Sequence, residues 1–151
     1  MSLIKPHAYA ELPEVFYNLQ NWEGFKNPSL VIENAQLKKE MGLQNIEGYK
    51  LLEIFNGSSQ IKTLKPLSMV YAGHQFGQYV EQLGDGRGLL LGQINSSSGL
   101  IDIHLKGAGK TPYSRFGDGR AVLRSVIRAV SYTHLRAHET VLDLVCRLLL
   151  E

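Results

Sequence analysis

The sequence is poor in the features that mark secreted, membrane-spanning or nucleic-acid-binding proteins. It has 151 residues and a single cysteine, Cys146, which excludes an internal disulfide framework and is typical of a reducing compartment. No apolar run approaches the roughly 18 residues that a membrane span needs, and the first residues lack the basic-then-apolar layout of a signal peptide. The net charge of +2 is too small to indicate nucleic-acid binding. We therefore expect a cytoplasmic protein with neither a membrane nor a nucleic acid as partner.

Glycine, by contrast, is concentrated in one stretch. Eleven of the fifteen glycines fall between Gly73 and Gly119. Three turns contain glycines separated by one residue, and each turn has a cation beside such a pair: Gly84 and Gly86 with Arg87, Gly107 and Gly109 with Lys106, and Gly117 and Gly119 with Arg120. Unobstructed backbone amides next to cations are typical of anion-binding turns. The pattern predicts a site for a polyphosphate.

The remaining patterns indicate short helices and strands. Helices are expected at residues 34–41, with Asn34 as the N-cap and Gly42 after the end, and at residues 49–56. Strands are expected at residues 89–94 and 100–106, joined by a polar turn. The second strand alternates apolar and ionisable residues and ends at Lys106. A glycine turn, a hairpin and then a strand lysine is the layout with which kinase-like folds bind phosphates, so the predicted class is α+β.

Two features around residue 118 leave alternatives open. Asp118 either caps a helix that starts near Gly119 or contacts a ribose hydroxyl or a metal-bound phosphate, and its position before an apolar stripe favours the cap. Arg120, Arg124 and Arg128 follow at intervals of four residues. On a helix these like charges indicate either an anionic neighbour or a solvated face.

Four segments together resemble one protein family. They are Tyr-Ala-Gly-His-Gln-Phe-Gly from Tyr71, Gln-Leu-Gly-Asp-Gly-Arg from Gln82, His-Leu-Lys-Gly-Ala-Gly-Lys-Thr-Pro-Tyr-Ser-Arg from His104, and Gly-Asp-Gly-Arg-Ala-Val-Leu-Arg-Ser from Gly117. In order and spacing they closely resemble the selenoprotein O family, also called the YdiU family, over about residues 12–128. The resemblance implies a protein-kinase-like fold, a pseudokinase, that holds ATP in a flipped orientation. It also implies transfer of AMP from ATP to Ser, Thr or Tyr hydroxyls of protein substrates, with Mg²⁺ or Mn²⁺.

The resemblance also assigns nucleotide contacts residue by residue. These contacts are Gly84, Gly86, Arg87, Lys106, Asp118 and Gly119. For Asp118 the family favours the nucleotide role over the helix cap. The family's catalytic aspartate and metal ligands belong to a much longer C-terminal portion, so no residue of this chain is assigned a catalytic or metal-binding role.

The end of the chain departs from the family. Ala129 stands where the family has a glutamate that pairs with the strand lysine, and residues 131–151 resemble nothing in the family. We expect residues 1–130 to be the N-terminal part of a kinase-like nucleotide-binding domain, incomplete in this chain. Residues 131–151 are expected to form an amphipathic helix foreign to that fold. As it stands, the chain is expected to be an inactive N-terminal portion of a protein adenylyltransferase. The alternative is a non-catalytic nucleotide-binding or interaction module.

Overall fold

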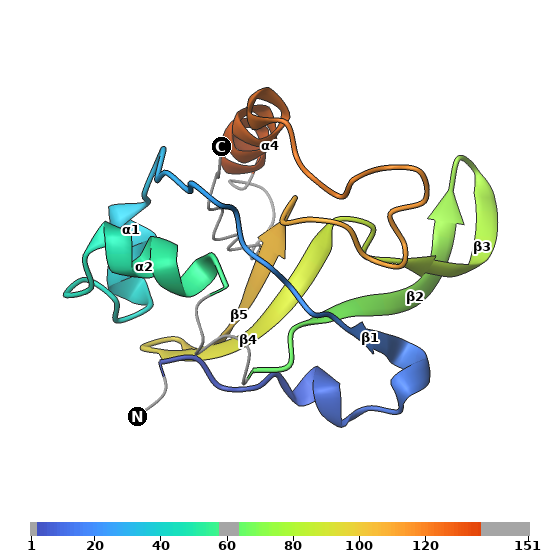
Figure 1. The fold of residues 1–151 in the computed structure, drawn as a ribbon, viewed down its shortest axis with the longest axis horizontal. Helices are drawn as coiled ribbons and strands as arrows, with labels where there is room; N and C mark the ends of the chain where they lie inside the picture. The colour runs from blue at the N-terminus through green and yellow to red at the C-terminus, as the bar shows by residue number, and fades with distance from the viewer. Residues whose placement is uncertain (1–2, 58–63, 137–151) are drawn as a thin grey trace.

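The protein folds as a small antiparallel sheet with helices packed beside it (Figure 1). The structure, a computed structural model, describes residues 3–57 and 64–136. In chain order the elements are the 3-10 helices η1 (Ala8–Glu11) and η2 (Glu14–Phe16), β1 (Tyr17–Leu19), α1 (Ala35–Glu40), α2 (Gly48–Phe55), β2 (Leu67–Gln75), β3 (Gln78–Gly84), β4 (Gly88–Ser96), β5 (Gly99–Lys106) and α4 (Leu123–Arg136). This confirms the α+β class, and the arrangement is that of a kinase-like N-terminal lobe.

The sheet has five strands in the order β1-β2-β4-β5, with β3 paired on β2. The first residues of β2 pair with β1 and, through Leu67 and Leu90, with β4, while the rest of β2 forms a hairpin with β3. Where β2 turns away from β4, the N-terminal segment takes its place. Lys5 and Gln93 exchange two backbone hydrogen bonds of 2.9 Å. The predicted β4–β5 hairpin is confirmed.

The main core lies between β4–β5 and the pair α1–α2. Its buried residues are Ile4, Leu37, Met41, Leu43, Leu51, Phe55, Leu64, Leu89, Leu91, Ile94, Ile103 and Leu105. A register shift between Leu90 and Gly92 bends β4. A bulge of this kind adds one residue to its strand and so interrupts the strict alternation of side chains. As a result, Leu89, Leu91 and Ile94 all lie in the core. Leu90 lies instead in a second buried cluster with Tyr17 and Leu67.

The two early helices form where their sequence signals predicted them. Asn34 caps α1 by accepting a hydrogen bond from the Leu37 amide at 3.0 Å, and Gly42 follows with a φ of +70°. Both helices bury one side against the core, through Leu37 on α1 and through Leu51 and Phe55 on α2.

The prediction of a helix starting near Gly119 is wrong, because α4 begins at Leu123. The Asp118 carboxylate accepts a hydrogen bond from the Arg120 amide at 2.9 Å, and Gly119 has a φ of +71°. This local turn is incompatible with helix at residues 118–120. Arg120 therefore precedes α4, and the three arginines do not form one helical stripe. Of the expected tail helix, residues 131–136 continue α4, and the remainder lies outside the described residues.

Among the helices of the described segments, none is long and apolar enough to cross a membrane.

Candidate functional site

The glycine turn between β3 and β4 is packed against the segment that follows β5. A Cβ added to Gly84 would lie 2.3 Å from the ring of Tyr113, and one added to Gly86 would lie 2.8 Å from the Tyr113 carbonyl oxygen. Real Cβ atoms do not approach other atoms this closely, so both positions require glycine for close packing. The sequence pattern indicated bare amides for a ligand, and the structure adds this second, internal reason.

All four carbonyls from Asp85 to Gly88 accept a hydrogen bond. The Asp85 and Gly86 carbonyls accept from the hydroxyls of Thr111, at 2.6 Å, and Ser114, at 2.5 Å. The Gly107 amide donates to the Arg87 carbonyl at 2.6 Å, and the Ser68 hydroxyl donates to the Gly88 carbonyl at 3.3 Å. Three separate segments of the chain therefore hold this turn.

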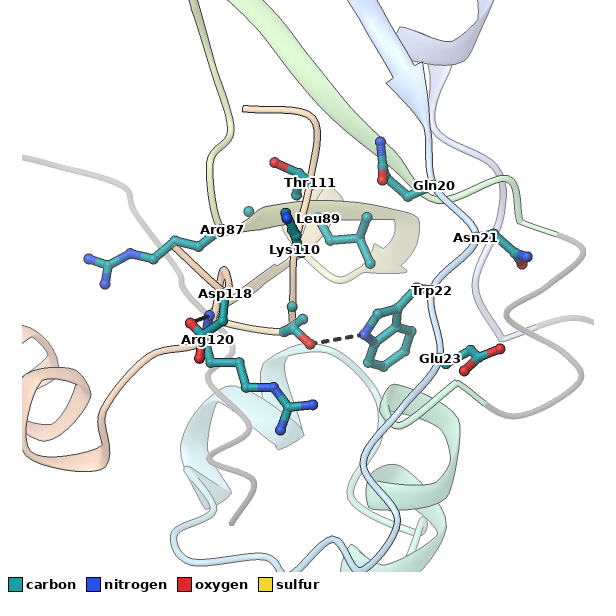
Figure 2. Close-up of a pocket in the computed structure, with 13 residues that line it drawn as sticks. Gln20, Asn21, Trp22, Glu23, Arg87, Leu89, Lys110, Thr111, Asp118 and Arg120 are labelled. Carbon is teal, nitrogen blue, oxygen red and sulfur yellow. Dashed lines mark hydrogen bonds between the residues drawn. The ribbon is translucent and has the colours of Figure 1, made fainter. Parts of the chain in front are cut away.

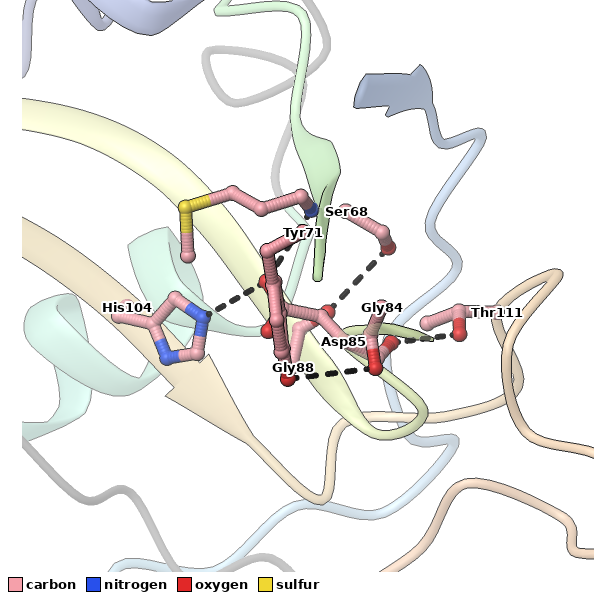
Figure 3. A network of polar contacts seen from close by, with 8 residues as sticks. Ser68, Tyr71, Gly84, Asp85, Gly88, His104 and Thr111 are labelled. Carbon is pink, nitrogen blue, oxygen red and sulfur yellow. Dashed lines mark hydrogen bonds and ion pairs between the residues drawn. The ribbon is translucent and has the colours of Figure 1, made fainter. Parts of the chain in front are cut away.

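The Asp85 side chain points into the sheet and belongs to a polar network (Figure 3). Its carboxylate accepts a hydrogen bond from the Met69 amide at 3.1 Å and lies 3.5 Å from Nε2 of His104. Tyr71 is 48% exposed, and the partial burial of its phenol, followed by the negative charge of Asp85, raises its pKa above the ordinary value of 10.0. Asp85 therefore stabilises the base of the turn and lines neither of the two cavities beside the turn.

Two cavities open beside the glycine turn. The larger, of about 650 Å³, is bounded by the turn, by β2 and by residues 112–120. The smaller, of about 350 Å³, lies between the turn, residues 20–23 and residues 108–111. Arg87, Asp118 and Arg120 line both, so the two cavities meet at a group of two cations and one carboxylate.

The lining of the larger cavity is cationic. Its charged lining residues are three arginines, Arg87, Arg115 and Arg120, and one carboxylate, that of Asp118. Arg115 donates to the Gln75 side-chain oxygen at 2.7 Å, and the Arg120 guanidinium stacks 4.7 Å from the centre of the Phe25 ring. Within the described residues, the exposed Arg87 forms no ion pair with a carboxylate. An anion entering this cavity would therefore meet an arginine not already neutralised by a carboxylate.

Five of the six predicted nucleotide contacts lie around the larger cavity: Gly84, Gly86, Arg87, Asp118 and Gly119. Gly119 is held by close packing as well as by its positive φ, because a Cβ there would lie 1.9 Å from the Gly109 carbonyl oxygen.

Lys106, the sixth predicted contact, lines neither cavity. Successive side chains of a strand point to opposite faces. Leu105 points into the core, so Lys106 points to the other face of β5. Its backbone is nevertheless opposite Gly88, at the end of the glycine turn.

Sequence reasoning did not assign Trp22, Thr111, Tyr113 or Ser114 to the site. The Trp22 ring lines the smaller cavity, and its Nε1 donates to the Ala108 carbonyl at 3.3 Å (Figure 2). Thr111 and Ser114 flank Pro112-Tyr113, and nothing local in this pattern distinguishes their hydroxyls as part of a site. Their partners lie more than twenty residues earlier in the chain, at Asp85 and Gly86.

The described segments contain no grouping of three or more His, Cys, Asp or Glu side chains that could hold a metal ion.

Comparison with known proteins gives consistent matches. The family model described as protein adenylyltransferase SelO matches residues 2–138, past the boundary expected at residue 130. The protein nucleotidyltransferase YdiU of Vibrio parahaemolyticus is 50% identical over 123 residues, which cover 81% of this chain and 25% of the relative. That of Vibrio vulnificus is 52% identical over 122 residues, covering 80% and 25%. That of Ruegeria pomeroyi is 46% identical over 123 residues, covering 81% and 26%.

The chain spans about a quarter of the length of the curated relatives it matches. The match to the family model extends over most of the chain and includes both sides of the larger cavity. The chain therefore belongs to the SelO family, whose model is described as protein adenylyltransferase.

Proposed function

We propose that this chain is the N-terminal, nucleotide-binding portion of an ATP-dependent protein adenylyltransferase, which transfers AMP to Ser, Thr or Tyr hydroxyls of proteins. The observation that carries the proposal is the grouping of Gly84, Gly86, Arg87, Asp118 and Gly119 around one cationic cavity of about 650 Å³. Cavities of this size are in the range that holds small ligands. Family membership supports the same assignment.

In this proposal the glycine turn and Arg87 bind the phosphates of ATP. A guanidinium and backbone amides suit phosphate oxygens because charge-assisted hydrogen bonds are stronger than neutral ones. Asp118 lies where the two cavities meet, and its carboxylate would accept a hydrogen bond from a ribose hydroxyl. Lys106 would contribute from the end of β5, beside the turn, and less strongly than Arg87 because it lies outside both linings.

The reaction proposed for the longer protein has a simple atom balance. The acceptor hydroxyl oxygen forms a bond to the α-phosphorus of ATP, the bond from that phosphorus to pyrophosphate breaks, and a base takes the hydroxyl proton. The present chain would bind and orient the nucleotide for this step. Mg²⁺ or Mn²⁺ is expected to neutralise the triphosphate in the longer protein. Its ligands are expected to lie in the C-terminal portion of that longer protein.

ATP binding by the 151-residue chain tests the proposal directly. Trp22 is the single tryptophan and lines the smaller cavity, so its fluorescence and calorimetry can both follow a titration with ATP. We expect saturable binding, weakened about 10- to 100-fold in Arg87→Ala, since a hydrogen bond to a charged group contributes about 1.5–3 kcal/mol. Arg128→Ala is the matched control, because this exposed arginine on α4 lines neither cavity. Lys106→Ala is expected to weaken binding less than Arg87→Ala.

Two results would contradict the proposal: absence of saturable binding to the wild-type chain, or equal affinity of Arg87→Ala and Arg128→Ala. A separate incubation with labelled ATP, Mg²⁺ or Mn²⁺ and a protein acceptor tests the catalytic part. The chain alone is expected to transfer no label. Efficient labelling would show that these residues suffice for AMP transfer.

A further inference from the structure

We propose that Thr111 and Ser114 are positioning residues of the nucleotide site. Their hydroxyls hold the glycine turn so that the amides of Gly86 and Arg87 face a bound polyphosphate. The inference rests on the proposed function, since it concerns how the same site presents its donors. It adds two residues that contact the backbone of the turn and act on the ligand only through that backbone.

The two hydroxyls bind consecutive peptide groups. Thr111 Oγ1 donates to the Asp85 carbonyl at 2.6 Å, and Ser114 Oγ donates to the Gly86 carbonyl at 2.5 Å. Thr111 is 7% exposed, one of two buried polar side chains in the part of the chain that the structure describes. A buried hydroxyl is costly without a partner, so the Thr111 hydrogen bond is expected to be made throughout the folded state.

Peptide geometry transmits these bonds to the amides. Each peptide unit is planar, and in the trans form its C=O and N–H point in opposite directions. The described residues contain no cis peptide bond. When Thr111 holds the Asp85 carbonyl, the Gly86 amide in the same plane points away from Thr111. When Ser114 holds the Gly86 carbonyl, the Arg87 amide points away from Ser114 in the same manner.

Both amides lack a protein acceptor in the part of the chain that the structure describes. Within residues 3–57 and 64–136, neither the Gly86 amide nor the Arg87 amide donates a hydrogen bond to the protein. The Asp85 amide, by contrast, donates to the Met69 carbonyl at 3.0 Å. The turn therefore has its carbonyls occupied by the protein and two consecutive amides open, in the same stretch of backbone that carries the Arg87 side chain. This combination suits phosphate oxygens, which only accept hydrogen bonds.

The segment that carries the hydroxyls is itself ordered by local bonds. The Thr111 amide donates to Ser114 Oγ at 2.8 Å, the Tyr113 amide donates to Thr111 Oγ1 at 3.2 Å, and the Ser114 amide donates to the Thr111 carbonyl at 3.1 Å. Each hydroxyl thus accepts from its own turn and donates to the glycine turn. Pro112 restricts the backbone further, because its ring fixes φ. The donors are held in place before a ligand arrives.

The test uses the full 151-residue chain and two probes, ATP and inorganic tripolyphosphate. Thr111→Val keeps the branched shape and removes the hydroxyl, and Ser114→Ala removes the other. We expect each variant to bind both probes about tenfold more weakly, by analogy with the loss of one hydrogen bond that supports a charged ligand. Thr111→Ser and Ser114→Thr, which keep a hydroxyl, are expected to retain most of the affinity.

Amide NMR signals separate positioning from a general structural role. In the wild-type chain, tripolyphosphate is expected to shift the Gly86 and Arg87 amide signals. In Thr111→Val the shift at Gly86 should shrink most, and in Ser114→Ala the shift at Arg87 should shrink most. A merely structural role would lower the melting temperature without this residue-by-residue difference.

The outcomes are distinct. If the wild-type chain binds neither probe, the proposed function fails and this inference fails with it. If the wild-type chain binds and the folded variants bind equally well with unchanged amide shifts, the inference alone is overturned. Should Thr111→Val not fold, Ser114→Ala decides, since Ser114 is only half-buried and its loss leaves the Thr111 bond in place.

Discussion

Substitution of Gly84 by alanine probes the contact that brings the two sides of the site together. A methyl group at this position would lie 2.3, 2.5 and 2.7 Å from three atoms of the Tyr113 ring. Movement of the ring away from this position would break the hydrogen bond between its hydroxyl and the Asn18 side chain. Gly84 does not have a positive φ, so the expected cost is steric and not conformational.

The expected loss of stability is about 1–3 kcal/mol, the usual range for an added group in a packed site. For a chain of this size, 1 kcal/mol corresponds to about 2–4 °C in the melting temperature, which calorimetry or circular dichroism can resolve. Gly73→Ala is the matched control. It is also a glycine of the β2–β3 hairpin, but its added Cβ meets only one atom, Leu83 Cδ1, at 3.8 Å. The control should change stability by less than about 1 kcal/mol.

A double-mutant cycle with Tyr113→Ala identifies the cause. If the ring is responsible, Gly84→Ala should cost much less in the Tyr113→Ala background, with a coupling of at least about 1 kcal/mol. An equal cost in both backgrounds would refute the steric reasoning. A melting temperature of Gly84→Ala equal to that of the wild-type chain would also refute it.

Two further substitutions test the backbone and electrostatics of the site. Gly119→Ala should be at least about 1 kcal/mol more destabilising than Gly42→Ala in chemical denaturation. Both glycines have a φ near +70°, but only at Gly119 would the added Cβ meet another backbone atom, at 1.9 Å. Equal costs would contradict the packing argument. Asp85→Asn should lower the raised pKa of Tyr71 only in part, since burial is the larger cause. The titration of Tyr71 is obtained as the difference in phenolate absorbance between a chain with Tyr71 and the same chain carrying Tyr71→Phe, with and without Asp85→Asn. As pH rises past about 10, the folded chain keeps a Tyr71 proton that the unfolded chain releases, so the free energy of unfolding should fall there. If Asp85→Asn leaves the titration of Tyr71 unchanged, Asp85 has no effect on that pKa.

Sequence patterns predicted the elements whose signals are local. The cap at Asn34 and the alternation of β5 involve residues within a few positions of each other, and both are present in the structure. β3 was not predicted, because its glutamines and glutamate give no apolar alternation. It is stabilised by pairing with β2, with no residue in its run fully buried. The start of α4 was misplaced because the Asp118 turn competes with the helix for the same amides.

For the site, the sequence identified residues but not their arrangement. The glycines and Arg87 stood out by composition, and the structure places them at one cavity. The hydroxyls of Thr111 and Ser114 carried no distinguishing local signal, since their partners are 26 and 28 positions away. The alternation of β5 predicted that Lys106 points away from the apolar face, but not that Lys106 lies outside the linings of both cavities.

The pairing of Lys5 with Gln93 has a consequence for the edges of the sheet. Unpaired strand edges offer rows of donors and acceptors to other chains and invite strand addition. Past Leu90, β4 loses β2 as a neighbour on one side, and the backbone near Lys5 covers the exposed groups of Gln93. Protection of a central strand against intermolecular pairing therefore depends on a few residues near the N-terminal end of the sequence.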